Sequence, residues 1–247
     1  MAGRTVVVTG GGKGMGASIS RAFIDAGDRV VIASRSASDD RSLENARFIP
    51  CDVRRPADLR AALDDAAADG RIDVLVNNAG SSGWRPLDDV DEAFWEEMIA
   101  TNLKSVIFAS QAAARHMGPV ASIVNISSLA GKRGSANNAV YCAAKFGVTG
   151  ITQALAKELG PRGIRVNAVC PVYVRTTGLE AALRDASAPP RGGDIGAYLD
   201  EFARSQAALG RLPTGDEVAR TCLFLASEAA SAITGQSLNV DCGVLPQ

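Results

Sequence analysis

Two side chains of this 247-residue chain have the spacing and the chemistry of a proton-transfer pair. Tyr141 and Lys145 stand four residues apart in a segment with helical periodicity, so both would project from one face of a helix. A free tyrosine has a pKa of about 10, which is too high for an efficient base near neutral pH. A neighbouring ammonium group favours the phenolate and lowers that pKa. The pair therefore predicts a tyrosine that exchanges a proton with a substrate oxygen.

A glycine-rich turn near the start of the chain predicts a phosphate-binding site. It reads Gly10-x-x-x-Gly14-x-Gly16, follows an apolar strand and opens a helix. Glycines allow a tight turn and let backbone N–H groups approach a pyrophosphate, and the helix N-terminus adds positive potential. The spacing differs from G-x-G-x-x-G, and the glycine after Lys13 excludes a Walker A loop.

The elements that must position these groups alternate between strands and helices. Short apolar, β-branched runs predict strands, and continuous apolar runs indicate a sheet that is buried on both faces. The pattern predicts one α/β domain over residues 1–247, a Rossmann-type doubly wound parallel sheet of about seven strands with helices on both faces. The strands are expected at 4–9, 29–34, 46–49, 72–77, 121–127, 164–169 and 237–240, and the helices at 15–26, 56–69, 91–117, 139–159 and 215–227, with more helix within 178–208.

Helix start signals support two of these helices. Asp88 and Asp89 precede one of them, and Thr214 with Glu217 forms a capping box for another.

Composition narrows the function classes. The formal net charge of −1 lacks the basic footprint of a nucleic-acid binder, and no apolar run is long enough to span a bilayer. The only histidine, His116, leaves little room for a zinc site or a Ser-His-Asp hydrolase, so we expect no metal. The five cysteines include no C-x-x-C pair, which favours a reducing, cytoplasmic location.

The glycine turn is the first of several motifs that occur in a family order. It is followed by Asp52-Val53, Asn77-Asn78-Ala79-Gly80, Asn102, Ser128, Tyr141-x-x-x-Lys145, Pro171 and Asn239-Val240-Asp241. In this order and register the chain resembles the short-chain dehydrogenase/reductase family over nearly its whole length, and it is similar to the 3-oxoacyl-(acyl carrier protein) reductase-like members. The resemblance implies an oxidoreductase that transfers hydride between a nicotinamide and a carbonyl or alcohol carbon.

The resemblance also implies which residues hold the dinucleotide. Gly10, Gly14, Met15 and Gly16 would line the pyrophosphate and the nearby ribose. The Asp52 carboxylate would accept from the adenine amine beside Val53. The remaining contacts would come from Asn78, Ala79 and Gly80 at the adenosine ribose, from Tyr141 and Lys145 at the nicotinamide ribose, and from Pro171, Val174 and Thr176 near the carboxamide.

The choice of cofactor follows from the end of the second strand. NAD-selective sites place a carboxylate there, but this chain reads Ala33-Ser34-Arg35-Ser36. Arg35 is able to bind a 2′-phosphate bidentately. Lys13 resembles the second basic residue of NADP-dependent members, and Arg41 is a possible third. The sequence therefore predicts NADP(H).

The remaining catalytic roles come from the resemblance. Ser128 would hydrogen-bond the substrate oxygen, with Ser127 as the competing choice, and Asn102 would hold a water that links Lys145 to solvent. In the reductive direction Tyr141 would donate the proton.

Two departures from the family pattern stand out. Val172 replaces the usual glycine after Pro171, which should narrow the pocket and would be strained if the position needs a positive φ. Cys242 replaces a glycine in the usual Asp-Gly-Gly ending and is a candidate for a subunit contact. Ser128, Trp84, Val172, Tyr173 and Tyr198 are the substrate candidates, with 177–213 as a lid.

Three functions remain open from the sequence. The first is a ketone reductase, and the second is a non-catalytic NADP(H)-binding regulatory module on the same fold. The third is an epimerase or dehydratase that works through transient redox. Family resemblance also implies a homotetramer, or a homodimer, that acts on a small-molecule carbonyl or alcohol and binds neither nucleic acid nor membrane.

Overall fold

The computed structural model describes residues 3–68 and 70–246 and contains one seven-stranded parallel sheet. The strand order is β3-β2-β1-β4-β5-β6-β7, so the order along the chain reverses between β1 and β4. In such sheets, ligands bind beyond the carboxyl ends of the strands where the order reverses. The strands are β1 (Thr5–Thr9), β2 (Arg29–Ser34), β3 (Arg47–Pro50), β4 (Val74–Asn77), β5 (Ser122–Ile126), β6 (Arg165–Pro171) and β7 (Ser237–Val240).

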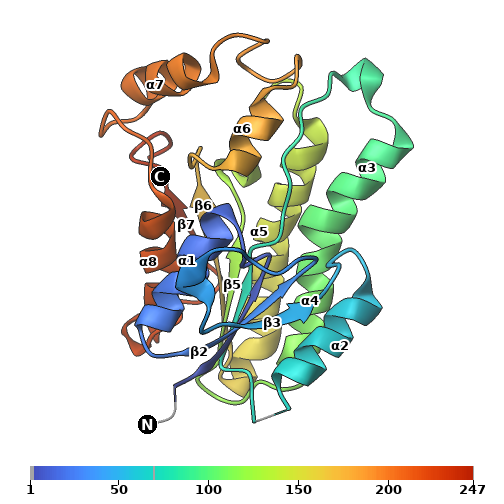
Figure 1. Ribbon diagram of the computed structural model, residues 1–247, viewed down its shortest axis with the longest axis vertical. Helices are drawn as coiled ribbons and strands as arrows, with labels where there is room; N and C mark the ends of the chain where they lie inside the picture. Colours follow the sequence, from blue (N-terminus) through green and yellow to red (C-terminus); the bar gives the residue numbers. More distant parts are fainter. Residues whose placement is uncertain (1–2, 69, 247) are drawn as a thin grey trace.

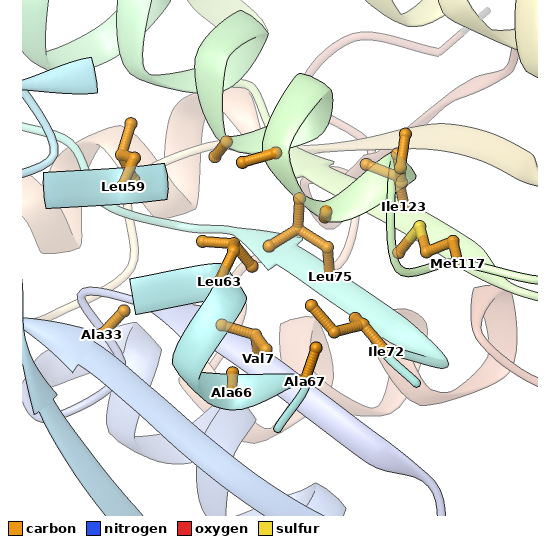
Figure 2. Close-up of a cluster of buried hydrophobic side chains, with 14 of the residues drawn as sticks. Val7, Ala33, Leu59, Leu63, Ala66, Ala67, Ile72, Leu75, Met117 and Ile123 are labelled. Carbon is orange, nitrogen blue, oxygen red and sulfur yellow. The ribbon is translucent and has the colours of Figure 1, made fainter. Parts of the chain in front are cut away.

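The two faces of the sheet are buried in separate hydrophobic clusters. Successive side chains of a strand point to opposite faces, so Val7 belongs to one cluster and Val6 and Val8 belong to the other. Figure 2 shows the first cluster, where Leu59 and Leu63 pack near β1 and β4. Burial on both faces explains why the strands read as continuous apolar runs.

The helices form a layer on each face of the sheet (Figure 1). α1 (Gly14–Asp25) and α8 (Gly215–Leu225) pack together on one face. The other face is covered by α2 (Pro56–Ala66), α4 (Ser105–Ala114) and α5 (Ala139–Leu159), with α3 (Glu92–Ile99) beside α5. In Figure 1, α6 (Thr177–Leu183) and α7 (Ile195–Gln206) lie at the top of the molecule, past the end of β6.

The predicted elements are present, with corrections to two of the helices. All seven strands occur within two residues of their predicted ends, and the capping box of Thr214 and Glu217 is formed. The helix predicted at 91–117 is split by a π-helical turn, Ala100–Lys104, and Asp91 rather than Asp88 or Asp89 caps α3. The helix predicted at 56–69 ends at Ala66, and its last predicted residue lies outside the described part of the chain.

Over the described residues, no helix combines the length and the apolar character that a membrane span requires.

Candidate active site

The residues predicted for cofactor binding and catalysis surround one cleft of about 670 Å³. The cleft lies beyond the carboxyl ends of the strands, and the glycine turn, the ends of β2 and β6, helix α5 and helix α6 all contribute to its wall. It brings together Gly10, Lys13, Gly14, Met15, Gly16, Ser34, Arg35, Asp52, Val53, Asn78, Ala79, Gly80, Asn102, Ser128, Tyr141, Lys145, Pro171, Val172, Val174 and Thr176.

The glycine turn has no room for larger residues. Gly10 and Gly14 adopt positive φ angles of 64° and 49°, which favour glycine. A Cβ on Gly16 would lie 2.3 Å from the carbonyl oxygen of Gly10, so the start of α1 packs directly against the turn. The backbone can therefore form a close-fitting cradle at the N-terminus of α1, which suits a pyrophosphate.

Asn78 has a structural role that the sequence did not reveal. Its Nδ2 donates to the carbonyl oxygens of Thr9 and Gly10, at 3.0 and 3.1 Å. The Thr9 hydroxyl accepts from the backbone N–H groups of Asn78 and Ala79, at 3.0 and 3.1 Å. These bonds fix the segment after β4 to the glycine turn, so the Asn78 side chain is occupied by the protein itself.

Positive charge gathers where the second strand ends. Lys13 and Arg35 are exposed, and both line the cleft together with Ser34. The Ser34 hydroxyl donates to the carbonyl oxygen of Ser36 at 2.9 Å. Arg41, the third predicted basic residue, lies in an exposed 3-10 turn and is not part of the cleft wall. The glycine cradle and these two cations fit a phosphorylated dinucleotide.

Lys145 is buried beside Tyr141. Its side chain is 5 % exposed, and its Nζ donates to the carbonyl oxygen of Ile126 at the end of β5, at 2.9 Å. The Nζ lies 5.6 Å from the centre of the Tyr141 ring. Tyr141 is hydrogen-bonded to the Ser128 side chain, and Ser128 rather than Ser127 is the serine that meets the tyrosine. The hydroxyl of Ser127 instead donates to the carbonyl oxygen of Lys145, at 3.1 Å.

The direction of the tyrosine pKa differs from the sequence-based expectation. Burial raises the pKa of Tyr141 to about 12, and the hydrogen bond with Ser128 offsets this only in part. Burial also lowers the pKa of Lys145 to about 8. The lowered tyrosine pKa that the sequence predicts is not found in this structure, because desolvation of the phenolate is the largest influence on the group.

Asn102 lies in the π-helical turn and is completely buried. Its Nδ2 donates to the carbonyl oxygen of Met98 at 3.0 Å, and its Oδ1 accepts from the backbone N–H of Ser81 at 3.1 Å. The amide group thus holds the segment after Gly80 against the helix. This placement makes the side chain a positioning group for the cleft wall, in addition to the water-holding role that the family resemblance implies.

Asp52 is more constrained than the sequence suggested. Its carboxylate accepts from Arg54 Nε at 2.9 and 3.1 Å and from Arg54 Nη2 at 2.6 Å. These hydrogen bonds lower the pKa of Asp52 to about 2. Both carboxylate oxygens therefore have a cationic partner, and the adenine contact predicted for Asp52 stays a prediction.

Of the two departures from the family pattern, Cys242 and not Val172 has a positive φ. Val172 has no positive φ, and its backbone N–H donates to the carbonyl oxygen of Val240 at 3.4 Å, so the feared strain is absent. Cys242 does adopt a positive φ, 54°, at a position where the family pattern has glycine. Such a conformation costs a non-glycine residue about 1 kcal/mol.

Most of the predicted substrate residues do not line the cleft. Val172 and Ser128 belong to its wall, but Trp84, Tyr173 and Tyr198 do not. Trp84 is buried in a cluster with residues of α6 and α7, including Leu183 and Leu199. The Tyr173 ring packs edge-on against Tyr198, with centroids 6.1 Å apart. In this structure these aromatic side chains pack with residues of α6 and α7 and are not part of the cleft wall.

Several cleft residues escaped the sequence analysis. Arg54 and Glu97 were missed, although an arginine two residues after Asp52 was a usable signal for pairing. The wall formed by Thr177, Gly178, Leu179, Ala181 and Ala182 was anticipated only as part of a lid. Thr176 begins this helix, because its side chain accepts from the backbone N–H of Leu179 at 3.1 Å.

Comparison with known proteins places the chain in a family. The family model described as enoyl-(acyl carrier protein) reductase matches residues 10–245. A putative ketoacyl reductase of the monensin polyketide synthase from Streptomyces virginiae is 40% identical over 256 residues, covering 98% of this chain and 97% of the relative. L-xylulose reductase from Bos taurus is 38% identical over 252 residues, covering 99% and 98%.

Solved structures agree with this assignment. The ligand-free aldohexose dehydrogenase of Thermoplasma acidophilum has a TM-score of 0.89 at 32% identity, covering 100% of this chain and 98% of its own. A variant of actinorhodin polyketide ketoreductase with NADPH has a TM-score of 0.88 at 31% identity, covering 98% and 97%. The chain belongs to the short-chain dehydrogenase/reductase family. It is an oxidoreductase of that family, whose members bind a nicotinamide cofactor.

The burial of Lys145 predicts a measurable cost in stability. Below pH 8 the ammonium is charged in both the folded and the unfolded chain, so its desolvation destabilises the fold in full. Between about pH 8 and 10.5 the unfolded chain binds more protons, and the cost declines as the pH rises. We expect Lys145→Met to raise the Tm of the cofactor-free protein by a few degrees at pH 7, with the gain shrinking towards pH 10.

Thermal unfolding of wild type and Lys145→Met over this pH range tests the prediction. A Tm for Lys145→Met below that of wild type at pH 7 would show that the hydrogen bond to Ile126 outweighs the desolvation of the ammonium.

Proposed function

We propose that this protein is an NADP(H)-dependent oxidoreductase that interconverts a ketone and a secondary alcohol and works mainly as a carbonyl reductase. The observation that carries the proposal is the convergence of Ser128, Tyr141 and Lys145 on a cleft whose other end presents Lys13 and Arg35. The names of the relatives support the reaction class, and the NADPH in one structural neighbour supports the cofactor.

The proposed mechanism assigns one task to each side chain. A bound nicotinamide supplies the hydride for reduction or accepts it in oxidation. Ser128 and Tyr141 donate hydrogen bonds to the substrate carbonyl oxygen, which polarises the carbonyl group. Tyr141 then gives its proton to that oxygen as general acid. Lys145 positions the ribose and stabilises the phenolate, and Asn102 holds the wall beside Gly80.

The proposal also includes a lid, a cellular location and an oligomeric state. Residues 177–213 would close the substrate end of the single domain, since α6 already forms part of the cleft wall. We also propose a cytoplasmic homotetramer or homodimer. Its support is the family resemblance together with the apolar side chains Trp95, Ile107 and Phe146, which are exposed on α3, α4 and α5.

The regulatory alternative has less support. A non-catalytic NADP(H)-binding module has no need of Asn102, Ser128, Tyr141 and Lys145 around one cleft. The relatives named above are reductases and dehydrogenases.

If the cofactor is NADP(H), the protein should bind NADPH more tightly than NADH. Arg35 and Lys13 add charge-assisted hydrogen bonds only to a 2′-phosphate, so NADPH should bind at least about tenfold more tightly than NADH. Parallel fluorescence titrations of the purified protein measure both dissociation constants. Tighter binding of NADH than of NADPH would refute the prediction that Arg35, at the end of β2, and Lys13 bind a 2′-phosphate.

If Tyr141 is the proton donor, its replacement should reduce turnover without weakening the binding of NADPH. Tyr141→Phe removes the proton donor and leaves the ring in place, so kcat should fall about 10²- to 10⁴-fold. The dissociation constant for NADPH should stay close to the wild-type value. Tyr173→Phe is the matched control, since Tyr173 lies in the aromatic cluster beside the lid. Equal turnover of Tyr141→Phe and wild type would contradict the assigned role.

A further inference from the structure

A chain of ion pairs crosses the rim of the cleft and takes no part in the mechanism above. Arg54 binds both carboxylate oxygens of Asp52, and its Nη1 donates to Glu97 Oε2 at 2.8 Å. Asp52 follows β3, whereas Glu97 belongs to α3, so one guanidinium joins two separate walls. All three residues line the cleft.

Arg35 lies within electrostatic reach of the same carboxylate. Its positive charge contributes to the lowered pKa of Asp52, although Arg54 is the larger cause. Within residues 3–68 and 70–246, Arg35 itself makes no hydrogen bond or ion pair. Asp52 therefore has two cationic neighbours, and Arg54 alone holds it.

The geometry of Arg54 explains why it, rather than Arg35, pairs with Asp52. A guanidinium that meets a carboxylate with two nitrogens forms a charge-assisted bidentate pair, the strongest arrangement for these groups. The Asp52 side chain is 16% exposed and that of Arg54 is 37% exposed, so solvent screens this pair less than a fully exposed one. Glu97 is more exposed, at 51%, and adds less.

We propose that Arg54 is a cofactor-selectivity residue: it occupies the carboxylates of Asp52 and Glu97 and so keeps Arg35 free to bind a 2′-phosphate. The proposal rests on the NADP(H) dependence proposed above. Without Arg54, the rim would carry two uncompensated carboxylates beside a ligand rich in phosphate, and Asp52 would compete with the ligand for Arg35. NADPH would lose more affinity than NADH, because only NADPH uses Arg35 through its additional phosphate.

A purely structural role for Arg54 predicts a different effect on the two dissociation constants. If Arg54 served only to tie the segment after β3 to α3, its removal would weaken the binding of both cofactors by the same factor. The ratio of the two dissociation constants separates the two roles.

The experiment is a fluorescence titration with NADPH and with NADH for wild type and four variants. Arg54→Gln should reduce the preference for NADPH about fivefold, and less at high salt. Adding Asp52→Asn to Arg54→Gln should bring the preference back to that of Asp52→Asn alone, because the competing charge is gone. Arg55→Gln is the matched control, since Arg55 is the exposed neighbour at the start of α2.

Each outcome has a distinct meaning. An unchanged NADPH/NADH ratio in Arg54→Gln, or a double variant that does not regain its preference, would overturn the proposal while wild type still prefers NADPH. A wild type without that preference would overturn the proposed cofactor first and this inference with it. If Arg54→Gln fails to fold, Arg54→Lys supplies the comparison: a single ammonium cannot span both carboxylates, so a partial loss of preference is expected.

Discussion

The burial of one ammonium group, that of Lys145, is the constraint on which the site depends. A buried lysine costs free energy unless polar groups surround it, and this one is held by the carbonyl oxygen of Ile126. The neighbouring backbone comes close enough to need glycine. A Cβ on Gly131 would lie 2.6 Å from the carbonyl oxygen of Lys145, and a Cβ on Gly80 would lie 2.9 Å from Asn102 Oδ1 and 3.7 Å from Lys145 Nζ. The fold thus loses some stability by burying Lys145, and the site gains an ammonium group beside Tyr141.

The parallel sheet makes this placement possible. The strand order reverses between β1 and β4, and the cleft lies beyond the carboxyl ends of the strands, where such a reversal favours ligand binding. Asn78 ties the two segments together through the carbonyl oxygens of Thr9 and Gly10. The residues predicted for dinucleotide binding and for proton transfer therefore line one cleft, and Arg54 lines the same cleft.

Much of the fold and the grouping of the site could be predicted from the sequence, because both follow from local patterns. Continuous apolar runs identify the strands, and the glycine spacing identifies the turn before α1. Other features depend on contacts between distant segments. The rise of the Tyr141 pKa requires knowledge of its burial, and the sequence around Trp84 gives no local sign that this side chain packs with α6 and α7. Backbone angles are equally hidden, so strain was expected at Val172 and occurs at Cys242.

We propose that Tyr141 is the proton-transfer group and that burial suppresses its ionisation until the cofactor and Lys145 together favour the phenolate. The pH dependence of kcat/KM for oxidation of a secondary alcohol at saturating NADP⁺ tests this most directly, since it reports the ionisation of the enzyme–cofactor complex. We expect the rate to rise with pH through an apparent pKa below about 9 that belongs to the Tyr141–Lys145 pair, and we expect this limb to be absent in Tyr141→Phe. A rate that does not change with pH, or a limb that persists in Tyr141→Phe, would contradict this role for Tyr141.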